Sequence, residues 1–308
     1  MATKKPKASA KSTKTKTTKP KTVAKTVVKS VSEAPKTKVV EETKPAKKSC
    51  FKDFFCKKYE GNESILTIFK NSKFYGALLG EIIGTALITM IIFSLFFTGL
   101  HQMATYTAGF AIIAVYVAIY AFSGACFNPM ITVGMMPSRR ISVIRGIMYI
   151  IAEVIGAWIG WLVFNAFHLA GGETATDVPA LAAIGENQFF IFAMVELLGA
   201  IIIAFFFARA LVYKRSVFTF GAIAAGGIIL ATFIGVIVSA IFVNLNNNFA
   251  FNPATALMLQ IFPTSGEDFG VIIAGIGQAL AVYALFPMIG GVIGFYLSDL
   301  TAKLSGEE

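Results

Sequence analysis

The sequence predicts an all-α membrane protein, a bundle of six transmembrane helices with two re-entrant half-helices. The first observation is composition, because 56% of the 308 residues are hydrophobic and only 14% are charged. Soluble domains carry about 25% charged residues. The second is the presence of six apolar runs, each close to the length of about 20 residues that a helix needs to cross a membrane. The third is a pair of shorter apolar segments that each begin with Asn-Pro.

The first 60 residues differ in composition from the rest of the chain. They contain 18 Lys and 5 acidic residues, whereas residues 61–308 contain 9 Lys or Arg and 12 acidic residues. Because large apolar side chains are almost absent before Phe51, we expect residues 1–60 to form a disordered cytoplasmic tail. Two roles stay open for it: attraction to anionic membrane lipid, to which each Lys contributes about 1 kcal/mol, and solvation without a specific partner. Nucleic-acid binding is not expected of a tail tethered to a membrane.

The apolar runs are the predicted spans, and the basic residues between them set the orientation. Lys70, Arg139 and Arg209 mark loops on one side of the arrangement, while the loops on the other side contain no Lys or Arg. Since loops rich in Lys and Arg stay in the cytoplasm, we expect a multi-pass protein of the cell (plasma) membrane with both termini cytoplasmic. The predicted spans lie at residues 75–98, 105–123, 143–168, 188–211, 217–243 and 272–299.

The membrane domain contains an internal repeat. Glu81 in the first span is followed 47 residues later by Asn128-Pro129, and Glu196 in the fourth span is followed 56 residues later by Asn252-Pro253. Each half has three spans, an odd number, so the halves cross the membrane in opposite directions. Such inverted repeats build sites near the bilayer midplane from broken helices. The two halves extend over about residues 74–170 and about residues 186–300.

The Asn-Pro pairs predict helices that start inside the membrane. Asn is a favoured N-cap and Pro is favoured at the first helical position. The segments that follow, Pro129–Met136 and Pro253–Phe262, reach only about 12–15 Å as helices, half of the hydrocarbon core. Unpaired N–H groups at such starts are costly in lipid unless protein or water meets them.

Two inverted half-helices that meet end to end beside a water-filled pore would satisfy these N–H groups. Their positive N-terminal ends repel cations, and the side-chain amides of Asn128 and Asn252 can donate hydrogen bonds to a passing neutral molecule. The alternative is a pair of helix caps without a pore.

These motifs resemble those of the aquaporin and aquaglyceroporin family, the major intrinsic proteins. The resemblance rests on SGACFNPMIT (123–132), YIIAEVIGAWIG (149–160), FNPATAL (251–257) and the two Glu-x-x-Gly spans, and it covers about residues 74–300. It implies an inverted-repeat, aquaporin-like channel domain over residues 61–308 that forms a homotetramer with one pore per subunit. The implied function is passive conduction of small neutral solutes, namely water, glycerol-like polyols, urea or ammonia.

The resemblance also assigns roles to residues. Glu81 and Glu196 correspond to buried acids that brace the re-entrant loops by accepting backbone N–H groups. The pore centre corresponds to Asn128, Pro129, Met130, Asn252, Pro253 and Ala254, and ungapped counting from the two Asn residues places the selectivity filter at Ala108, Ala240, Phe249 and Thr255.

Several positions depart from the family pattern. Met130 replaces the usual Ala, and Glu153 replaces the more usual Gln, where we expect a hydrogen-bonding role in the core. Cys126 replaces a His of many members, and it is open whether its thiol faces the pore or packs inside.

Thr255 is the largest departure, because most members have an Arg at this filter position. With Ala108 and Ala240 at two other filter positions, the constriction is apolar, lacks a fixed charge and matches neither main substrate class. Two alternatives therefore remain open: a pore-closed membrane scaffold or adhesion protein of the same fold, and an ion-conducting variant. The residues show no nucleophile–base pair, phosphate loop or metal-ligand spacing, so we expect no enzyme activity, cofactor or metal.

Overall fold

The structure is a computed structural model, and it describes residues 65–98, 101–172, 184, 188–213, 216–242, 249–260 and 277–307. Contacts divide the chain into Met1–Cys50 and Phe51–Glu308, and the described residues all belong to the second unit. The predicted tail, residues 1–60, lies outside the described residues, so its disorder and its attraction to lipid stay predictions.

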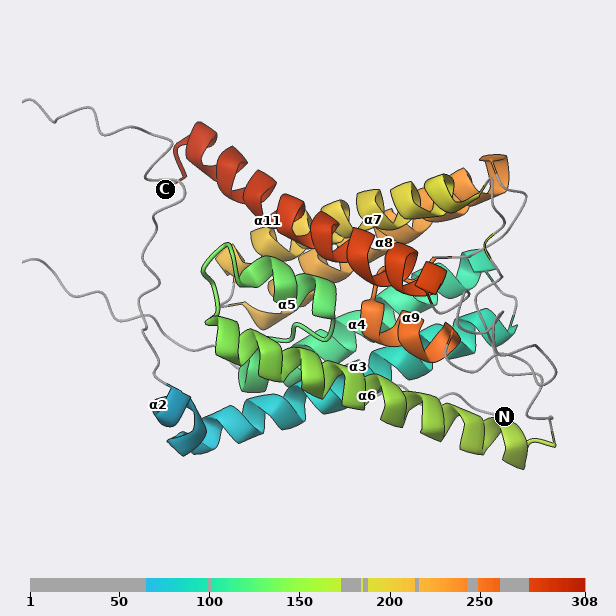
Figure 1. The fold of residues 1–308 in the computed structure, drawn as a ribbon, viewed down its shortest axis with the longest axis horizontal. Coiled ribbons are helices and arrows are strands. Elements are labelled where there is room, and N and C mark those ends of the chain that lie inside the picture. Colours follow the sequence, from blue (N-terminus) through green and yellow to red (C-terminus); the bar gives the residue numbers. More distant parts are fainter. Residues whose placement is uncertain are drawn as a thin grey trace, which may run out of the picture. The chain divides into compact units, whose positions relative to one another are not determined.

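Every element in the described part of the chain is helical, which confirms the predicted fold class. Among the described residues, five helices are long and apolar enough to cross a membrane, and α4 occupies the predicted second span, where its described apolar stretch is Gly109–Ser123. The elements are α2 (Ile65–Lys70), α3 (Ser72–Thr98), α4 (His101–Ser123), α5 (Pro129–Met135), α6 (Val143–Ala170), α7 (Phe189–Ala210), η2 (Leu211–Tyr213), α8 (Val217–Phe242), α9 (Pro253–Gln260), η3 (Ala281–Leu285) and α11 (Phe286–Ser305) (Figure 1).

Local sequence signals explain several helix ends. The Asn71 side chain accepts a hydrogen bond from the Lys73 N–H at the start of α3, and Ser142 does the same for Arg145 at the start of α6. The last helix ends at Gly306, whose φ of 72° is left-handed and suits glycine. Within that last membrane helix, the π-helical turn η3 lies just before Pro287, which has no N–H to donate to the preceding turn.

In the first half, α3 and α6 form one of the two most extensive helix pairs. Gly156 and Gly160 of α6 lie against the backbone carbonyls of Ile82 and Ala86 in α3, so closely that a Cβ at either glycine would collide with them. Glycines spaced four residues apart allow membrane helices to approach at backbone distance. The two carbonyls lie one and five residues after Glu81.

The second half repeats this contact between α7 and α11, the other extensive pair. Gly290 and Gly294 of α11 lie against the carbonyls of Leu197 and Ile201, which follow Glu196 by the same one and five residues. Figure 1 shows the two pairs, α3 with α6 and α7 with α11, on either side of the short helices. The predicted internal repeat is therefore present in the helix packing as well as in the motifs.

The short helices α5 and α9 lie between these two pairs (Figure 1). They contain 7 and 8 residues, which correspond to about 10–12 Å of helix, too short to span the hydrocarbon core. Helix α5 packs mainly against α11, α9 packs mainly against α6, and the two short helices also contact each other. Helix α5 belongs to the first half by sequence but packs mainly against α11 of the second half. Helix α9 belongs to the second half but packs mainly against α6 of the first.

Candidate pore centre

Asn128 and Asn252 cap the short helices that follow them. The Asn128 side-chain oxygen accepts a hydrogen bond from the Met130 N–H at 3.0 Å. The Asn252 oxygen accepts from the N–H groups of Ala254 at 3.1 Å and Thr255 at 3.4 Å. These are orphan N–H groups of the first helical turn, so both Asn side chains serve as N-caps.

The same two side chains join the halves of the chain. Asn128 Nδ2 donates to the Phe251 carbonyl at 2.7 Å, and Asn252 Nδ2 donates to the Phe127 carbonyl at 3.0 Å. An amide nitrogen carries two N–H groups, so each Asn keeps a second N–H beyond this reciprocal bond. The starts of α5 and α9 therefore lie side by side, although the bonded residues are 123 and 125 positions apart.

Two buried carboxyls hold the loops before the short helices. Glu81 of α3 accepts hydrogen bonds from the Cys126 N–H at 3.2 Å and the Phe127 N–H at 2.7 Å. Glu196 of α7 accepts from the N–H groups of Ala250 at 2.6 Å and Phe251 at 3.0 Å. Both Glu side chains are fully buried, and these are the backbone donors that the family resemblance assigns to bracing acids.

The residue before each Asn adopts a left-handed backbone conformation. Phe127 has φ 53° and Phe251 has φ 52°, a region that bulky residues rarely adopt. Their N–H groups are the ones that Glu81 and Glu196 accept, so each brace holds a strained residue in place.

The Glu-x-x-Gly motif has a physical basis in this arrangement. The Phe127 ring occupies the space where a Cβ of Gly84 would stand, and the Phe251 ring does the same at Gly199. Each glycine lies three residues after a bracing Glu, so one helix turn supplies both the acceptor and the room for the aromatic ring.

Glu153 gives the first loop a further contact. Its Oε1 accepts from the Asn128 N–H at 3.2 Å and from the Thr132 hydroxyl at 2.5 Å, which is the hydrogen-bonding role expected from the sequence. Glu153 lies three residues before Gly156. The residue three positions before Gly290, the counterpart of Gly156 in the second half, is Pro287, which has no carboxyl. The two loops are therefore held differently.

The structure places three of the four predicted filter residues, Thr255, Phe249 and Ala240, in different surroundings. Thr255 is fully buried and shares a hydrogen bond of 3.0 Å with Thr89 of α3. Phe249 stacks on Phe251 with ring centroids 4.8 Å apart. Ala240 is exposed on α8, and Ala108 lies in α4 with its side chain outside the described part of the structure.

Thr89 was not singled out from the sequence. Its spacing in the sequence could have indicated it. One face of α3 carries polar side chains at intervals of four residues, namely Glu81, Thr85 and Thr89. All three are fully buried.

We predict that Thr89 and Thr255 are energetically coupled. Thr255→Val removes one hydroxyl from a buried pair and should lower the free energy of unfolding by about 1 kcal/mol. Thr89→Val should do the same, and the double variant should lose less than the sum of the two, as measured by denaturant titration in detergent. Strictly additive losses would show that the two hydroxyls do not stabilise each other.

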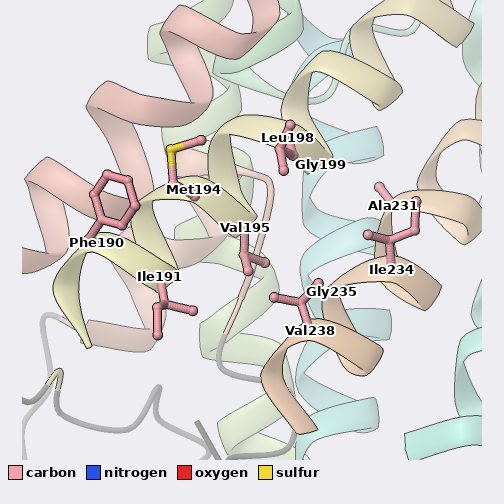
Figure 2. Close-up of a pocket in the computed structure, with 10 residues that line it drawn as sticks. All are labelled: Phe190, Ile191, Met194, Val195, Leu198, Gly199, Ala231, Ile234, Gly235 and Val238. Atoms are coloured by element: carbon pink, nitrogen blue, oxygen red, sulfur yellow. The ribbon is translucent and has the colours of Figure 1, made fainter. Parts of the chain in front are cut away.

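A cavity of about 240 Å³ between α7 and α8 is separate from this centre (Figure 2). Its walls are apolar and include Phe190, Met194, Leu198 and Ile234. It contains neither of the capping Asn residues nor a bracing carboxyl, so its chemistry is that of a membrane-helix groove and not of a pore.

The chain matches the family model of the major intrinsic proteins over residues 68–297. It belongs to the major intrinsic protein family. This confirms the resemblance carried by the Asn-Pro and Glu-x-x-Gly motifs, and it makes the chain a multi-pass membrane protein. Members of the family are channels and not enzymes, in agreement with the sequence prediction.

Relatives of this major intrinsic protein include water and glycerol channels by name. It is 36% identical over 99 residues to glycerol uptake facilitator protein-like 6 of Lactiplantibacillus plantarum, covering 30% of this chain and 45% of that protein. It is 37% identical over 60 residues to aquaporin-1 of Ovis aries, covering 20% of this chain and 22% of the relative. These matches span less than half of the length of either relative.

A solved structure shares the fold. The X-ray structure of the aquaglyceroporin from Plasmodium falciparum superposes with a TM-score of 0.51 at 16% identity, covering 74% of this chain and 95% of that chain. At this identity the likeness concerns the fold alone.

Proposed function

We propose that this major intrinsic protein is a passive transmembrane channel for small neutral solutes. The observation that carries the proposal is the junction of α5 and α9, where Asn128 and Asn252 each bond to the loop of the other half. The relatives' names, a glycerol uptake facilitator and an aquaporin, favour water and glycerol-like polyols among the solutes. Urea and ammonia remain within the same proposal.

The proposed pore centre uses polar groups that are not needed for the hydrogen bonds between the helices and loops. The second N–H of each capping Asn can donate to a solute hydroxyl or to water. The N-terminal ends of α5 and α9 carry partial positive charge and oppose the entry of cations and protons. A solute passes by exchanging hydrogen bonds with these groups, and no covalent chemistry is required.

Two bulky residues near the junction pack against the surrounding helices. Phe249 stacks on Phe251 and lies against Gly235 of α8. Met130 is fully buried against Gly291 of α11. Both side chains thus pack against helices that surround the junction.

The remaining assignments are part of the proposal. These are the channel domain over residues 61–308 with halves at about 74–170 and about 186–300, the homotetramer, the plasma membrane and the lipid-binding tail of residues 1–60. A cytoplasmic position of the C-terminal end is favoured by the ion pairs of Arg140 with Asp299 and Arg209 with Glu307, because Arg-rich ends stay in the cytoplasm.

Stopped-flow light scattering on proteoliposomes that contain the full chain tests the function. We expect faster osmotic water flux and faster glycerol flux than in matched empty liposomes. Water flux without solute flux would restrict the proposal to water, and the absence of both would favour the scaffold alternative. Currents in planar bilayers would instead indicate the ion-conducting variant.

We predict that Thr255→Arg lowers the ratio of glycerol to water flux by about tenfold, a barrier difference of about 1.4 kcal/mol. A guanidinium at this position would narrow the constriction and add a fixed positive charge. Thr255→Ser, which keeps the hydroxyl, is the matched control and should leave the ratio unchanged. An unchanged ratio in Thr255→Arg would mean that residue 255 does not line the constriction.

A further inference from the structure

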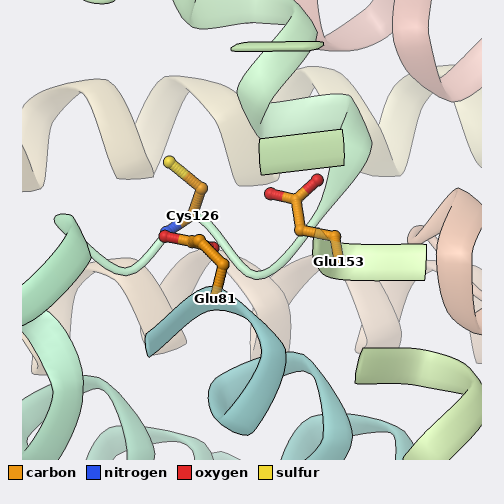
Figure 3. Close-up of side chains that lie close together, drawn as sticks. All are labelled: Glu81, Cys126 and Glu153. Carbon is orange, nitrogen blue, oxygen red and sulfur yellow. The ribbon is translucent and has the colours of Figure 1, made fainter. Parts of the chain in front are cut away.

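Three side chains with atoms that can bind a metal ion lie close together beside the first half-helix, α5. Holding the loop does not require all three. One carboxylate oxygen of Glu81, one of Glu153 and the Cys126 sulfur all lie within 4.8 Å of one another. The three residues come from α3, α6 and the loop before α5, and all are buried (Figure 3). Because they are far apart in sequence, ligand spacing could not predict this cluster.

A fourth donor stands next to the thiol. The Cys126 sulfur lies 3.5 Å from the thioether sulfur of Met135 at the end of α5. Met135 can therefore add a second sulfur to the thiol and the two carboxylate oxygens, and four ligands are the number that a tetrahedral metal site uses.

One of the two carboxylate oxygens of Glu153 has no hydrogen-bond partner. Its Oε1 is occupied by Asn128 and Thr132, whereas its Oε2 is buried without a hydrogen-bond partner. Figure 3 shows the Glu153 carboxyl turned toward Cys126 and Glu81, with one oxygen directed to the thiol side. Buried polar atoms without partners are rare in proteins, and a bound ion is one of the causes that account for them.

The charges of the cluster point to a cation. Two carboxyls this close, in a medium of low dielectric constant, cannot both be ionised unless a cation lies between them, and without a cation they share a proton. The second half offers a comparison, because both Glu196 oxygens accept backbone N–H groups and, among the described residues, Glu196 forms no cluster with another carboxyl or a thiol. Bracing thus needs one carboxyl, and the first half has a second carboxyl and a thiol in addition.

We propose that Glu81, Cys126 and Glu153, with Met135, bind a thiophilic divalent cation of the Zn²⁺ and Cd²⁺ class. Sulfur ligands favour soft or borderline ions, and the carboxylates favour a divalent charge. Ligand atoms around tetrahedral Zn²⁺ are about 3.3–3.8 Å apart, given bond lengths of about 2.0–2.3 Å. The site therefore has to close by about 1 Å around Zn²⁺ and by less around the larger Cd²⁺. Binding displaces the thiol proton and the proton that the two carboxyls share in the metal-free site, and both pass to water.

Binding of Cd²⁺ to the purified full-length chain tests the site without reference to transport. Cys50 and Cys56 are the other two cysteines, so they are first replaced by Ser to leave Cys126 as the single thiol. Equilibrium dialysis should give one tightly bound Cd²⁺ per chain, accompanied by the ultraviolet charge-transfer absorption of a cadmium–thiolate bond.

Two variants and one matched control define the ligands. Cys126→Ser should abolish the absorption and weaken binding at least 100-fold. Glu153→Gln keeps an oxygen for Asn128 and Thr132 and should weaken binding about 10–100-fold. Glu196→Gln changes an equally buried bracing carboxyl that, among the described residues, forms no cluster with a thiol, and the folded fraction of this less stable variant should bind Cd²⁺ as the parent does.

Parent-like affinity in Glu153→Gln, or equal weakening in Glu196→Gln, would overturn the site. If Cys126→Ser does not yield folded protein by size exclusion, the Glu153→Gln comparison decides. Flux measured on the same preparations separates the two proposals, because a chain that binds Cd²⁺ without conducting solutes would refute the channel and leave the metal site intact.

Discussion

Glu196→Ala is expected to abolish solute flux and to lower the free energy of unfolding by about 2–6 kcal/mol. The substitution leaves the N–H groups of Ala250 and Phe251 without their acceptor, and each buried unsatisfied donor costs about 1–3 kcal/mol. Phe251 also loses the contact that holds its left-handed backbone. Because Asn252 follows directly, the start of α9 should move away from Asn128. Proteoliposome flux and denaturant titration in detergent measure the two effects.

Glu196→Gln is the matched control for this prediction. An amide offers a single oxygen, so it can satisfy one of the two N–H donors, and we expect an intermediate loss of stability. Glu81→Ala should reproduce the large effect in the first half, reduced by the support that Glu153 gives to Asn128. Parent-like flux in Glu196→Ala would show that the loop keeps its shape without the brace.

The helices and their order could be predicted from the sequence because their signals are local. Length and apolar character indicated the spans, and Asn-Pro indicated the starts of α5 and α9. The ends were less well defined: α5 ends at Met135, one residue before the predicted end at Met136, and the predicted end of the second short helix at Phe262 lies outside the described residues. Those boundaries depend on the partners of the last carbonyls, which a single segment does not encode.

The contacts across the candidate site could not be predicted in the same way. The Thr89–Thr255 hydrogen bond joins residues 166 positions apart, and the reciprocal Asn bonds join residues more than 120 positions apart. The bonds from Glu81 of α3 and Glu196 of α7 hold the loops from which the two short helices start. The family resemblance implied four filter positions, which stay a prediction, and only packing shows that Thr255 turns toward α3.

The second prediction with a large expected effect concerns the glycines at which α7 and α11 approach each other most closely. Gly290→Ala is expected to lower the free energy of unfolding by about 2–3 kcal/mol. A Cβ at this position would lie 2.6 Å from the Leu197 carbonyl oxygen and 2.7 Å from the Ala200 Cβ. Backbone atoms cannot move aside as a flexible side chain can, so α7 and α11 must separate. Gly76→Ala in α3 is the matched control, since nothing lies within 4 Å of the added Cβ, and the better helix propensity of Ala should make it neutral or slightly stabilising.

The corresponding substitution in the first half, Gly156→Ala, tests whether two halves with the same helix packing also lose the same free energy of unfolding. Gly156→Ala would press a Cβ against the Ile82 carbonyl, the counterpart of the contact at Gly290. Equal losses at the two positions, measured by denaturant titration, would mean that each half depends on one close helix crossing to set the depth of its bracing Glu. A loss confined to one half would mean that the other crossing can widen without moving its brace. The start of the short helix in that half would then be held by the loop contacts alone.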